Sequence, residues 1–225
     1  PVCTMRYPSG AGEEIVKAEK TQNAPLFMCG QDWDVTAGER LEYRDRNGAL
    51  SLPLPSLPGA HQIENAALAV AMLRHQDRVP ISVDAIARGI VDARWPARLQ
   101  LLATGPLSAK AGSRKVWLDG GHNHDAGIAI AKHFAGQRLH LVIGMLVNKD
   151  PAALIAPLGG VLASIQVVPV VGQDSHSVAE FGTSARSAQN VADALANLPH
   201  DDLPVLIAGS LYLAGDVVLH NGEVP

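Results

Sequence analysis

The second half of the chain alternates short apolar runs with segments of helical spacing, and this alternation constrains the fold more than any other feature. The runs have the length and the unbroken aliphatic character of strands that are buried on both faces of a sheet. They comprise Val116–Leu118, Leu139–Leu146, Ile165–Val171 and Val205–Ala208. Because strands that alternate with helices form parallel sheets, the sequence predicts an α/β fold with a mostly parallel, Rossmann-like sheet covered by helices on both faces.

Helix signals fill the gaps between these runs. The positions with helical spacing are Ile128, Ala131 and Phe134 in one segment and Val191, Leu195 and Leu198 in another. Asp150 followed by Pro151 is typical of a helix start, with an acidic N-cap and proline at the first helical position, so Lys149 and Asp150 favour a capped helix over direct ligands. For the helix around Val191, the expected cap is Ser184 or Ser187.

The first part of the chain follows a different plan. The expected elements are strands at Pro1–Met5 and Pro25–Cys29, a helix from about Glu13, a hairpin in Leu41–Leu54 around Asn47-Gly48, and helices near Ile63–Leu73 and over about Ser82–Ala93. A proline-rich linker at residues 53–59 precedes the last two helices. The strands, helix and hairpin of residues 1–58 alone would expose an apolar sheet face. We therefore expect them to be the end of a domain whose remainder lies upstream.

Composition argues against several classes of protein. Eighteen Lys and Arg against 22 Asp and Glu give a net charge of −4, which argues against nonspecific nucleic-acid binding. Cys3 and Cys29 are the only cysteines and lack zinc-type spacing, so we expect a reducing compartment and a cytoplasmic protein. Prolines and glycines interrupt the uncharged stretch of residues 151–173, so we predict no membrane span.

The most informative segment is the turn that follows Val116–Leu118, with the sequence Asp119-Gly120-Gly121-His122-Asn123. It places an acid, two glycines and polar residues where the carboxyl edge of an open α/β sheet binds ligands. One interpretation is that Asp119 and Asp125 cap the next helix while the histidines are solvated. A second is that His122 and His124 bind a metal together with the acids. The histidine spacing departs from that of binuclear hydrolases, so we predict no metal ligand.

The same turn resembles the Asp-Gly-Ala-His-Asn turn of the folylpolyglutamate and dihydrofolate synthases, the folate branch of the Mur ligase superfamily. Four further segments resemble motifs of this family and occur in its order. They are His61-Gln62-Ile63-Glu64-Asn65-Ala66, Trp95-Pro96-Ala97-Arg98, Gly144-Met145-Leu146-Val147-Asn148-Lys149-Asp150 and Gly209-Ser210-Leu211-Tyr212-Leu213. Each motif is weak alone, but five in order exceed what a generic Rossmann fold shows. Gly121, Ala97, His124 and Asn148 depart from the family's Ala, Gly, Pro and Asp.

The resemblance implies a domain plan and a reaction. Residues 1–58 would be the C-terminal remnant of a larger, nucleotide-binding ATPase-type α/β domain, residues 59–93 a helical segment joining the domains, and residues 94–225 the Rossmann-like C-terminal ligase domain. In such ligases ATP phosphorylates a carboxylate, and the amine of an amino acid attacks the acyl phosphate to form an amide. The family's phosphate loop, Gly-x-x-x-x-Gly-Lys-Ser/Thr, does not occur in the sequence.

The resemblance also implies where the chain begins in the family. The strand at Pro1–Met5 aligns just after the catalytic lysine, so we expect the C-terminal part of a longer enzyme. Most ligands of Mg²⁺ would then lie upstream, and the chain alone would be inactive.

Five residues receive roles from the resemblance. Asn65 would hydrogen-bond the adenine of ATP, Arg98 would contact the ATP phosphates, and Asp119 would accept hydrogen bonds from the ribose hydroxyls. His122 and Ser210 would hold the carboxylate of the incoming glutamate, and Arg98 and His122 are the candidate catalytic residues. Other interpretations stay open: Asn65 as a polar residue on an exposed helix face, Arg98 in a surface ion pair, and Ser210 as a helix N-cap.

We therefore predict an ATP-dependent ligase that adds L-glutamate to dihydropteroate or a reduced folate, with ATP and Mg²⁺, as a dihydrofolate synthase/folylpolyglutamate synthase. The full-length enzyme is expected to be a monomer that binds neither nucleic acid nor membranes. One alternative is another Mur-superfamily amide ligase, acting on a cell-wall precursor or another acidic peptide. A different alternative is a noncatalytic nucleotide-binding or interaction module. A phosphate loop encoded upstream of Pro1 would favour the ligase.

Overall fold

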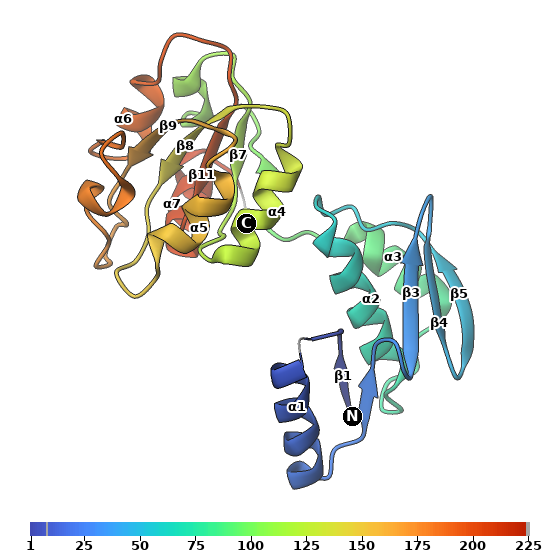
Figure 1. Cartoon of the computed structure of the whole chain (residues 1–225). Helices are drawn as coiled ribbons and strands as arrows, with labels where there is room; N and C mark the ends of the chain where they lie inside the picture. Colours follow the sequence, from blue (N-terminus) through green and yellow to red (C-terminus); the bar gives the residue numbers. More distant parts are fainter. Residues whose placement is uncertain (8, 224–225) are drawn as a thin grey trace. The chain divides into compact units, whose positions relative to one another are not determined.

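The computed structural model describes residues 1–7 and 9–223, and the chain divides into two compact units, Pro1–Arg94 and Trp95–Pro225 (Figure 1). Each unit has its own hydrophobic core. None of the helices in the described part of the chain has the length and apolar character needed to span a bilayer.

The first unit combines a parallel strand pair, an antiparallel sheet of order β3-β4-β5 and helices. Its elements are β1 (Val2–Thr4), α1 (Ser9–Gln22), β2 (Leu26–Met28), β3 (Trp33–Ala37), β4 (Leu41–Asp45), β5 (Gly48–Leu52), α2 (His61–Arg74) and α3 (Val83–Asp92). The predicted hairpin is confirmed: Asp45 pairs with Gly48, whose φ of +106° is a conformation that glycine adopts without steric cost. Strand β3 was not predicted, although Trp33 and Val35 alternate with polar residues along it.

One face of the antiparallel sheet packs on α2 and α3. Leu41, Tyr43 and Leu52 are fully buried on this face, because alternate residues of a strand point to the same side. They share one apolar cluster with Ala67, Val70 and Ala71 of α2 and with Ile86 and Ile90 of α3. Most of residues 59–93 therefore pack as part of the first unit. The assignment of this unit to a larger domain stays a prediction.

The second unit is built on a sheet of order β10-β9-β8-β11-β7-β6, in which only the pairing of β6 with β7 is antiparallel within the described residues. Its elements are β6 (Gln100–Leu101), β7 (Val116–Leu118), α4 (His124–His133), β8 (Leu139–Ile143), α5 (Pro151–Leu158), β9 (Leu162–Val167), β10 (Arg186–Ser187), α6 (Val191–Ala196), β11 (Val205–Ala208) and α7 (Leu211–His220), with 3-10 helices at Ser108–Ala111 and Val178–Phe181. The predicted α/β fold with a mostly parallel sheet is confirmed.

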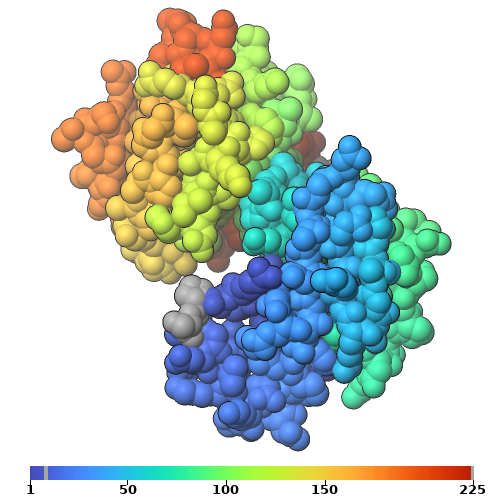
Figure 2. Space-filling model, turned by 45° about the vertical axis from the view of Figure 1, so that its right-hand side comes forward, coloured from blue at the N-terminus to red at the C-terminus, as the bar shows by residue number. Residues whose placement is uncertain are grey.

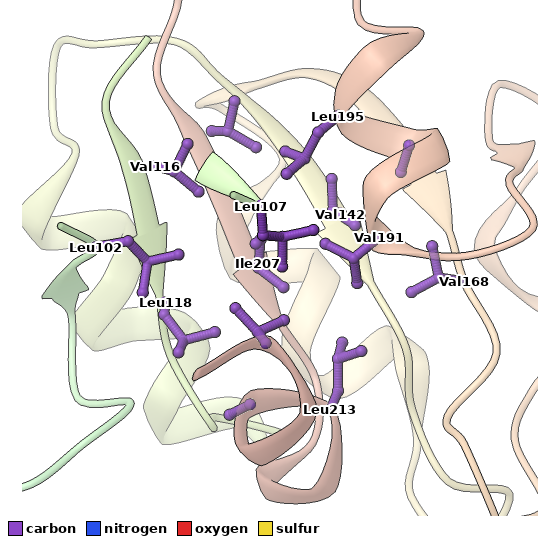
Figure 3. Close-up of a cluster of buried hydrophobic side chains, with 14 of the residues drawn as sticks. Leu102, Leu107, Val116, Leu118, Val142, Val168, Val191, Leu195, Ile207 and Leu213 are labelled. Atoms are coloured by element: carbon purple, nitrogen blue, oxygen red, sulfur yellow. The ribbon is translucent and has the colours of Figure 1, made fainter. Parts of the chain in front are cut away.

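Both faces of this sheet are buried, which explains the unbroken apolar runs in the sequence. The cluster on one face includes Val142 of β8 and Ile207 of β11, packed with Leu107, Val191, Leu195 and Leu213 (Figure 3). The cluster on the other face includes Leu141 and Leu206 of the same strands, packed with Ile130 of α4 and Leu154 and Leu158 of α5. Successive residues of one strand thus belong to opposite cores.

Helices α4 and α5 lie side by side on the surface of the second unit, in yellow-green and orange-yellow (Figure 2). Gly127 of α4 permits this close approach. A Cβ at this position would lie 2.7 Å from the carbonyl oxygen of Leu154 and 3.0 Å from a ring carbon of Pro157. Any larger residue at position 127 would therefore push the two helices apart.

Two predicted strands of the second unit differ from their expected bounds. Strand β9 covers Leu162–Val167 rather than Ile165–Val171. Pro169 interrupts the apolar run beyond the strand, because proline has no N–H to donate to a sheet. Strand β8 ends at Ile143, directly before Gly144. A Cβ at Gly144 would lie 2.9 Å from the carbonyl oxygen of Val168, so the backbone after β8 passes close to the backbone after β9.

One predicted helix start is confirmed and another is wrong. The carboxylate of Asp150 accepts a hydrogen bond from the N–H of Ala152 at 2.9 Å, and Pro151 is the first residue of α5. Helix α6, in contrast, begins after Asn190, whose side-chain oxygen accepts from the N–H of Asp193 at 2.9 Å. Neither Ser184 nor Ser187 is the cap, because both precede this asparagine by several residues.

Candidate functional site

The expected site residues of the second unit lie at the carboxyl edge of neighbouring strands. Asp119 follows β7, Gly144 follows β8 and Gly209 follows β11, and these strands are adjacent in the order β8-β11-β7. Backbone hydrogen bonds join their loops: Gly209 N–H donates to the carbonyl of Gly121 at 3.0 Å, and Gly144 N–H donates to that of Ala208 at 3.2 Å. Ligands of open α/β sheets bind outside such strand ends.

Arg98 lies between two residues whose backbone is left-handed, with φ of +57° at Ala97 and +45° at Leu99. This conformation costs residues that carry a Cβ roughly 1–2 kcal/mol each. Hydrogen bonds hold the segment in place: Ala97 N–H donates to the side-chain oxygen of Gln100, and Gly120 N–H donates to the carbonyl of Ala97, both at 2.9 Å. The half-buried Arg98 side chain has no hydrogen bond or ion pair to any other described residue.

Asp119 joins the Arg98 segment to the turn after β7. Its side chain is buried, Oδ2 accepts from the N–H of Leu99 at 2.8 Å, and Oδ1 accepts from the N–H of Gly121 at 2.6 Å. Helix α4 is capped by Asn123, whose side-chain oxygen accepts from the N–H of Ala126 at 2.9 Å. The interpretation of Asp119 as a helix cap is therefore wrong, because its oxygens bond to other backbone groups.

The ring of His122 has a defined hydrogen-bonding state. Its Nδ1 lies 3.0 Å from the carbonyl oxygen of Gly120. Because a carbonyl oxygen only accepts, Nδ1 carries the proton, and Nε2 is the atom left for a ligand. Nε2 accepts a hydrogen bond when the ring is neutral and donates one when the ring is protonated. His124 is the exposed first residue of α4. Among the described residues, no group of three or more His, Cys, Asp or Glu side chains could hold a metal ion.

Ser210 begins α7 as its N-cap, as one interpretation of the sequence predicted. Its buried Oγ accepts from the N–H of Tyr212 at 3.1 Å and keeps its own proton for donation. Gly209 before it has φ of +107°, and a Cβ there would lie 2.7 Å from the carbonyl oxygen of Gly144. Only glycine fits this position, so the backbone directly before Ser210 passes close to Gly144 after β8.

Asn65 belongs to the first unit and lies on the exposed side of α2. Its Nδ2 donates to the side-chain oxygen of Gln62 at 3.1 Å, and Nε2 of Gln62 lies 2.9 Å from Nε2 of His61. These contacts orient the amide of Asn65 and leave its oxygen to accept and its second N–H to donate. An adenine edge requires both functions. The adenine contact itself stays a prediction.

Sequence reasoning missed the left-handed segment around Arg98. A positive φ at alanine or leucine has no signature in the residue type, because only glycine adopts it at low cost. One signal was available: the family motif has glycine where this chain has Ala97, and the observed φ of +57° explains that preference.

No protein-family model matches the chain. The folylpolyglutamate synthase of Lacticaseibacillus casei is 33% identical over 236 residues, which cover 96% of this chain and 53% of that protein. The structure of E. coli FolC in complex with DHPP and ADP is 25% identical, with a TM-score of 0.78 over 97% of this chain and 53% of its own. The chain matches the C-terminal half of the folylpolyglutamate/dihydrofolate synthases.

The family resemblance drawn from the five motifs is thus confirmed. The Mycobacterium tuberculosis folylpolyglutamate synthase complexed with ADP is 22% identical and has the same fold, with a TM-score of 0.80 over 99% of this chain and 55% of its own. This chain spans about half the length of these folylpolyglutamate synthases. The ligand contacts of individual residues stay predictions.

Proposed function

We propose that the chain forms the ATP- and glutamate-binding part of an ATP-dependent ligase that adds L-glutamate to dihydropteroate or a folate. One observation carries this proposal: Arg98 lacks a partner among the described residues, yet strained and hydrogen-bonded backbone fixes it beside the Asp119–His122 turn at the ligand-binding edge. Strained backbone that the surroundings hold in place is typical of functional sites. The similarity to folylpolyglutamate synthases supports the same class of reaction.

In this proposal Arg98 contacts the phosphates of ATP. Its planar guanidinium presents several N–H donors, which suit the charge that develops as the γ-phosphoryl group moves to the substrate carboxylate. Asp119 accepts from the ribose hydroxyls while it holds the Arg98 segment, and the oriented amide of Asn65 binds the adenine.

The carboxylate of the incoming glutamate binds between His122 and Ser210. A protonated His122 donates through Nε2, and Ser210 donates through its hydroxyl. The N-terminus of α7 adds backbone N–H groups and a favourable helix dipole. A carboxylate held in this way leaves the amine of glutamate free to attack the acyl phosphate.

The groups that cradle the β and γ phosphates lie outside these 225 residues, since the sequence lacks the phosphate-loop motif. Acidic side chains of the described residues do not gather into a magnesium site, and we assign no Mg²⁺ ligand to this chain. The chain alone is accordingly proposed to be inactive.

The test uses the full-length gene product. We expect it to release ADP only when dihydropteroate or a reduced folate is present together with glutamate. Arg98→Ala should lower the rate of acyl-phosphate formation by about a hundredfold or more with little change in Tm, because the lost contact acts in the transition state. The control is Arg186→Ala, which removes an exposed arginine of β10. ADP release that does not depend on glutamate would reject the ligase proposal. A large fall in Tm of Arg98→Ala with normal specific activity would show that Arg98 has a structural role.

A further inference from the structure

We infer that Gln100 and Glu223 are positioning residues for Arg98, linked in a relay that holds Ala97 in its left-handed conformation. The inference rests on the proposed function of Arg98. The first link is the hydrogen bond from Ala97 N–H to the side-chain oxygen of Gln100, at 2.9 Å. Ala97 is buried, so without this acceptor its N–H would lose a partner in a place that water reaches poorly.

The second link joins Gln100 to the residues after α7. Nε2 of Gln100 donates to Oε2 of Glu223 at 2.8 Å. The other oxygen of Glu223 accepts from the N–H of Ala103 at 3.0 Å and from Nδ2 of Asn221 at 2.7 Å. The carboxylate therefore has a donor on each side, and its position is fixed by both.

The anchor of the relay is Asn221, which is buried directly after α7. Its side-chain oxygen accepts from the N–H of Ser108 at 2.9 Å, and its Nδ2 also donates to the carbonyl of Ala103 at 3.0 Å. A Cβ at Gly105 would collide with the backbone oxygen of Asn221, so the two segments are in close contact. The end of α7 thus provides a rigid support for Glu223.

The two ends of the Arg98 segment are held by different groups. Asp119 accepts from Leu99 on one side, and Gln100 accepts from Ala97 on the other. If the Gln100 contact were lost, Ala97 could relax to a right-handed conformation, and the peptide that carries Arg98 would turn. Arg98 would then reach the ATP phosphates in only a fraction of molecules, which lowers the rate of the chemical step.

The chemistry of the relay requires an amide at one position and a carboxylate at the other. Position 100 must accept from Ala97 and donate to position 223, whereas position 223 must accept on both sides. Gln100→Glu places a carboxylate opposite that of Glu223, so the donor between the two positions is lost and the two negative charges repel. Glu223→Gln places an NH₂ group opposite a hydrogen-bond donor, so one of the bonds that Glu223 accepts is lost. The double variant Gln100→Glu/Glu223→Gln restores each bond, because Gln at 223 would donate to Glu at 100 and still accept from Ala103 and Asn221.

The experiment measures steady-state kinetics of the full-length enzyme with these three variants. We expect Gln100→Glu to lower kcat about tenfold with an unchanged KM for glutamate, Glu223→Gln to lower it less, and the double variant to recover to within about threefold of the parent. The control is Gln76→Glu, since Gln76 likewise holds backbone groups of Leu73 and Val79 but lies in the first unit. That variant should keep kcat even if it lowers Tm.

Hydrogen exchange at the Ala97 amide gives a second readout that needs no turnover. Exchange should be faster in Gln100→Glu and slow again in the double variant. Unchanged exchange and kcat in Gln100→Glu would overturn the relay, and so would a double variant no better than the worse single one. A full-length protein without ligase activity would instead reject the proposed function, while the exchange data would still report whether the relay holds Ala97.

Discussion

Ala97 and Leu99 hold a backbone conformation that costs roughly 1–2 kcal/mol for each residue, and the surrounding contacts can offset that cost. Ordinary hydrogen bonds contribute about 0.5–1.5 kcal/mol, and bonds to a charged acceptor about 1.5–3 kcal/mol. The segment makes two bonds of the first kind, to Gln100 and Gly120, and one of the second kind, to Asp119. The balance favours the left-handed form only while these partners stay in place, so Arg98 depends on residues that need not touch a ligand.

His122 and His124 offer a comparison within one turn. His122→Ala in the full-length enzyme should raise the KM for glutamate by about ten- to a hundredfold and leave the KM for ATP unchanged. A charge-assisted hydrogen bond of about 1.5–3 kcal/mol is lost in this variant. His124→Ala should be nearly silent, because this residue is exposed at the start of α4. Steady-state kinetics with each substrate varied in turn measures both effects.

The metal interpretation predicts a different outcome for the same pair. Equal damage from both substitutions, with zinc found by elemental analysis and activity lost to a chelator, would contradict the glutamate assignment of His122.

At the residue scale, sequence indicated which residues gather at the site but not how the backbone holds them. Asp119 and His122 follow a recognisable strand, and their turn could be placed at a sheet edge from pattern alone. The hydrogen bond from Leu99 to Asp119 depends on positive φ angles at Ala97 and Leu99, residue types that rarely adopt them. Nothing in the residue types announces such angles.

Among the elements, α7 has one glycine directly before its N-cap, Gly209, and one within the helix, Gly215, and we expect opposite effects when each is replaced by alanine. Gly209→Ala should destabilise the second unit and lower activity, because the new Cβ would lie 2.7 Å from the carbonyl oxygen of Gly144 and φ is +107°. Gly215→Ala should stabilise it by about 0.5–1 kcal/mol, since Gly215 is an exposed interior residue of α7 with no neighbour near a Cβ. Urea unfolding measures both changes. Equal effects of the two substitutions would argue against the close approach at Gly209.

The end of α2 holds a buried titratable pair against the hairpin. Arg74 donates two hydrogen bonds to Asp45, each at 2.7 Å, and His75 stacks on Phe27 with ring centroids 4.0 Å apart. Burial lowers the pKa of His75 below its ordinary 6.5, although the nearby charge of Asp45 opposes this. Burial raises the pKa of Asp45, but hydrogen bonds from Arg74 and Asn47 outweigh it and hold that pKa below its usual value.

The signs of these shifts predict how stability varies with pH. Below about pH 6.5 the unfolded chain protonates His75 more readily than the folded chain does, so stability should fall as pH decreases from 7 to 5.5. His75→Phe keeps the stacked ring and cannot titrate, so it should flatten this slope. The free energy of unfolding should also fall below the ordinary pKa of Asp45, near 3.8, and this fall should persist in the variant. Unfolding free energies over this pH range provide the measurement. If the slope of stability against pH between pH 7 and 5.5 is the same in His75→Phe as in the parent, the shift inferred for His75 is wrong.

At the element scale, the spacing of apolar residues and the residues that begin or end elements predicted most strands and helices of the second unit. Apolar runs marked β7, β8 and β11, and Asp150-Pro151 marked the start of α5. Strand β3 was missed because Trp33 and Val35 alternate with polar residues, the pattern of a strand with one buried face, whereas the predicted strands of the second unit are unbroken apolar runs. The cap of α6 was misplaced because asparagine caps as well as serine does, and the helix length decides between them.

On the scale of the whole second unit, parallel strands explain why motifs far apart in sequence lie together. All strands that point the same way end at one edge, so residues after β7, β8 and β11 meet there whatever their spacing in the chain. The relay to Arg98 follows no such rule. Gln100 and Glu223 are 123 positions apart, one in an antiparallel edge strand and the other beyond the last helix. Contacts of this kind are set by tertiary packing, which no local pattern records.

The 225-residue chain by itself is expected to release no ADP above background. Transfer of the γ-phosphoryl group requires several preorganised groups around the β and γ phosphates, and the sequence has no Gly-x-x-x-x-Gly-Lys-Ser/Thr segment to supply them. Arg98 adds a single cation and cannot replace that cradle. An ADP assay with dihydropteroate and glutamate should compare the chain with the full-length gene product. The full-length Arg98→Ala variant serves as the low-activity reference. Substrate-dependent ADP release by the chain near the full-length rate would mean that the phosphate-handling groups lie within these residues.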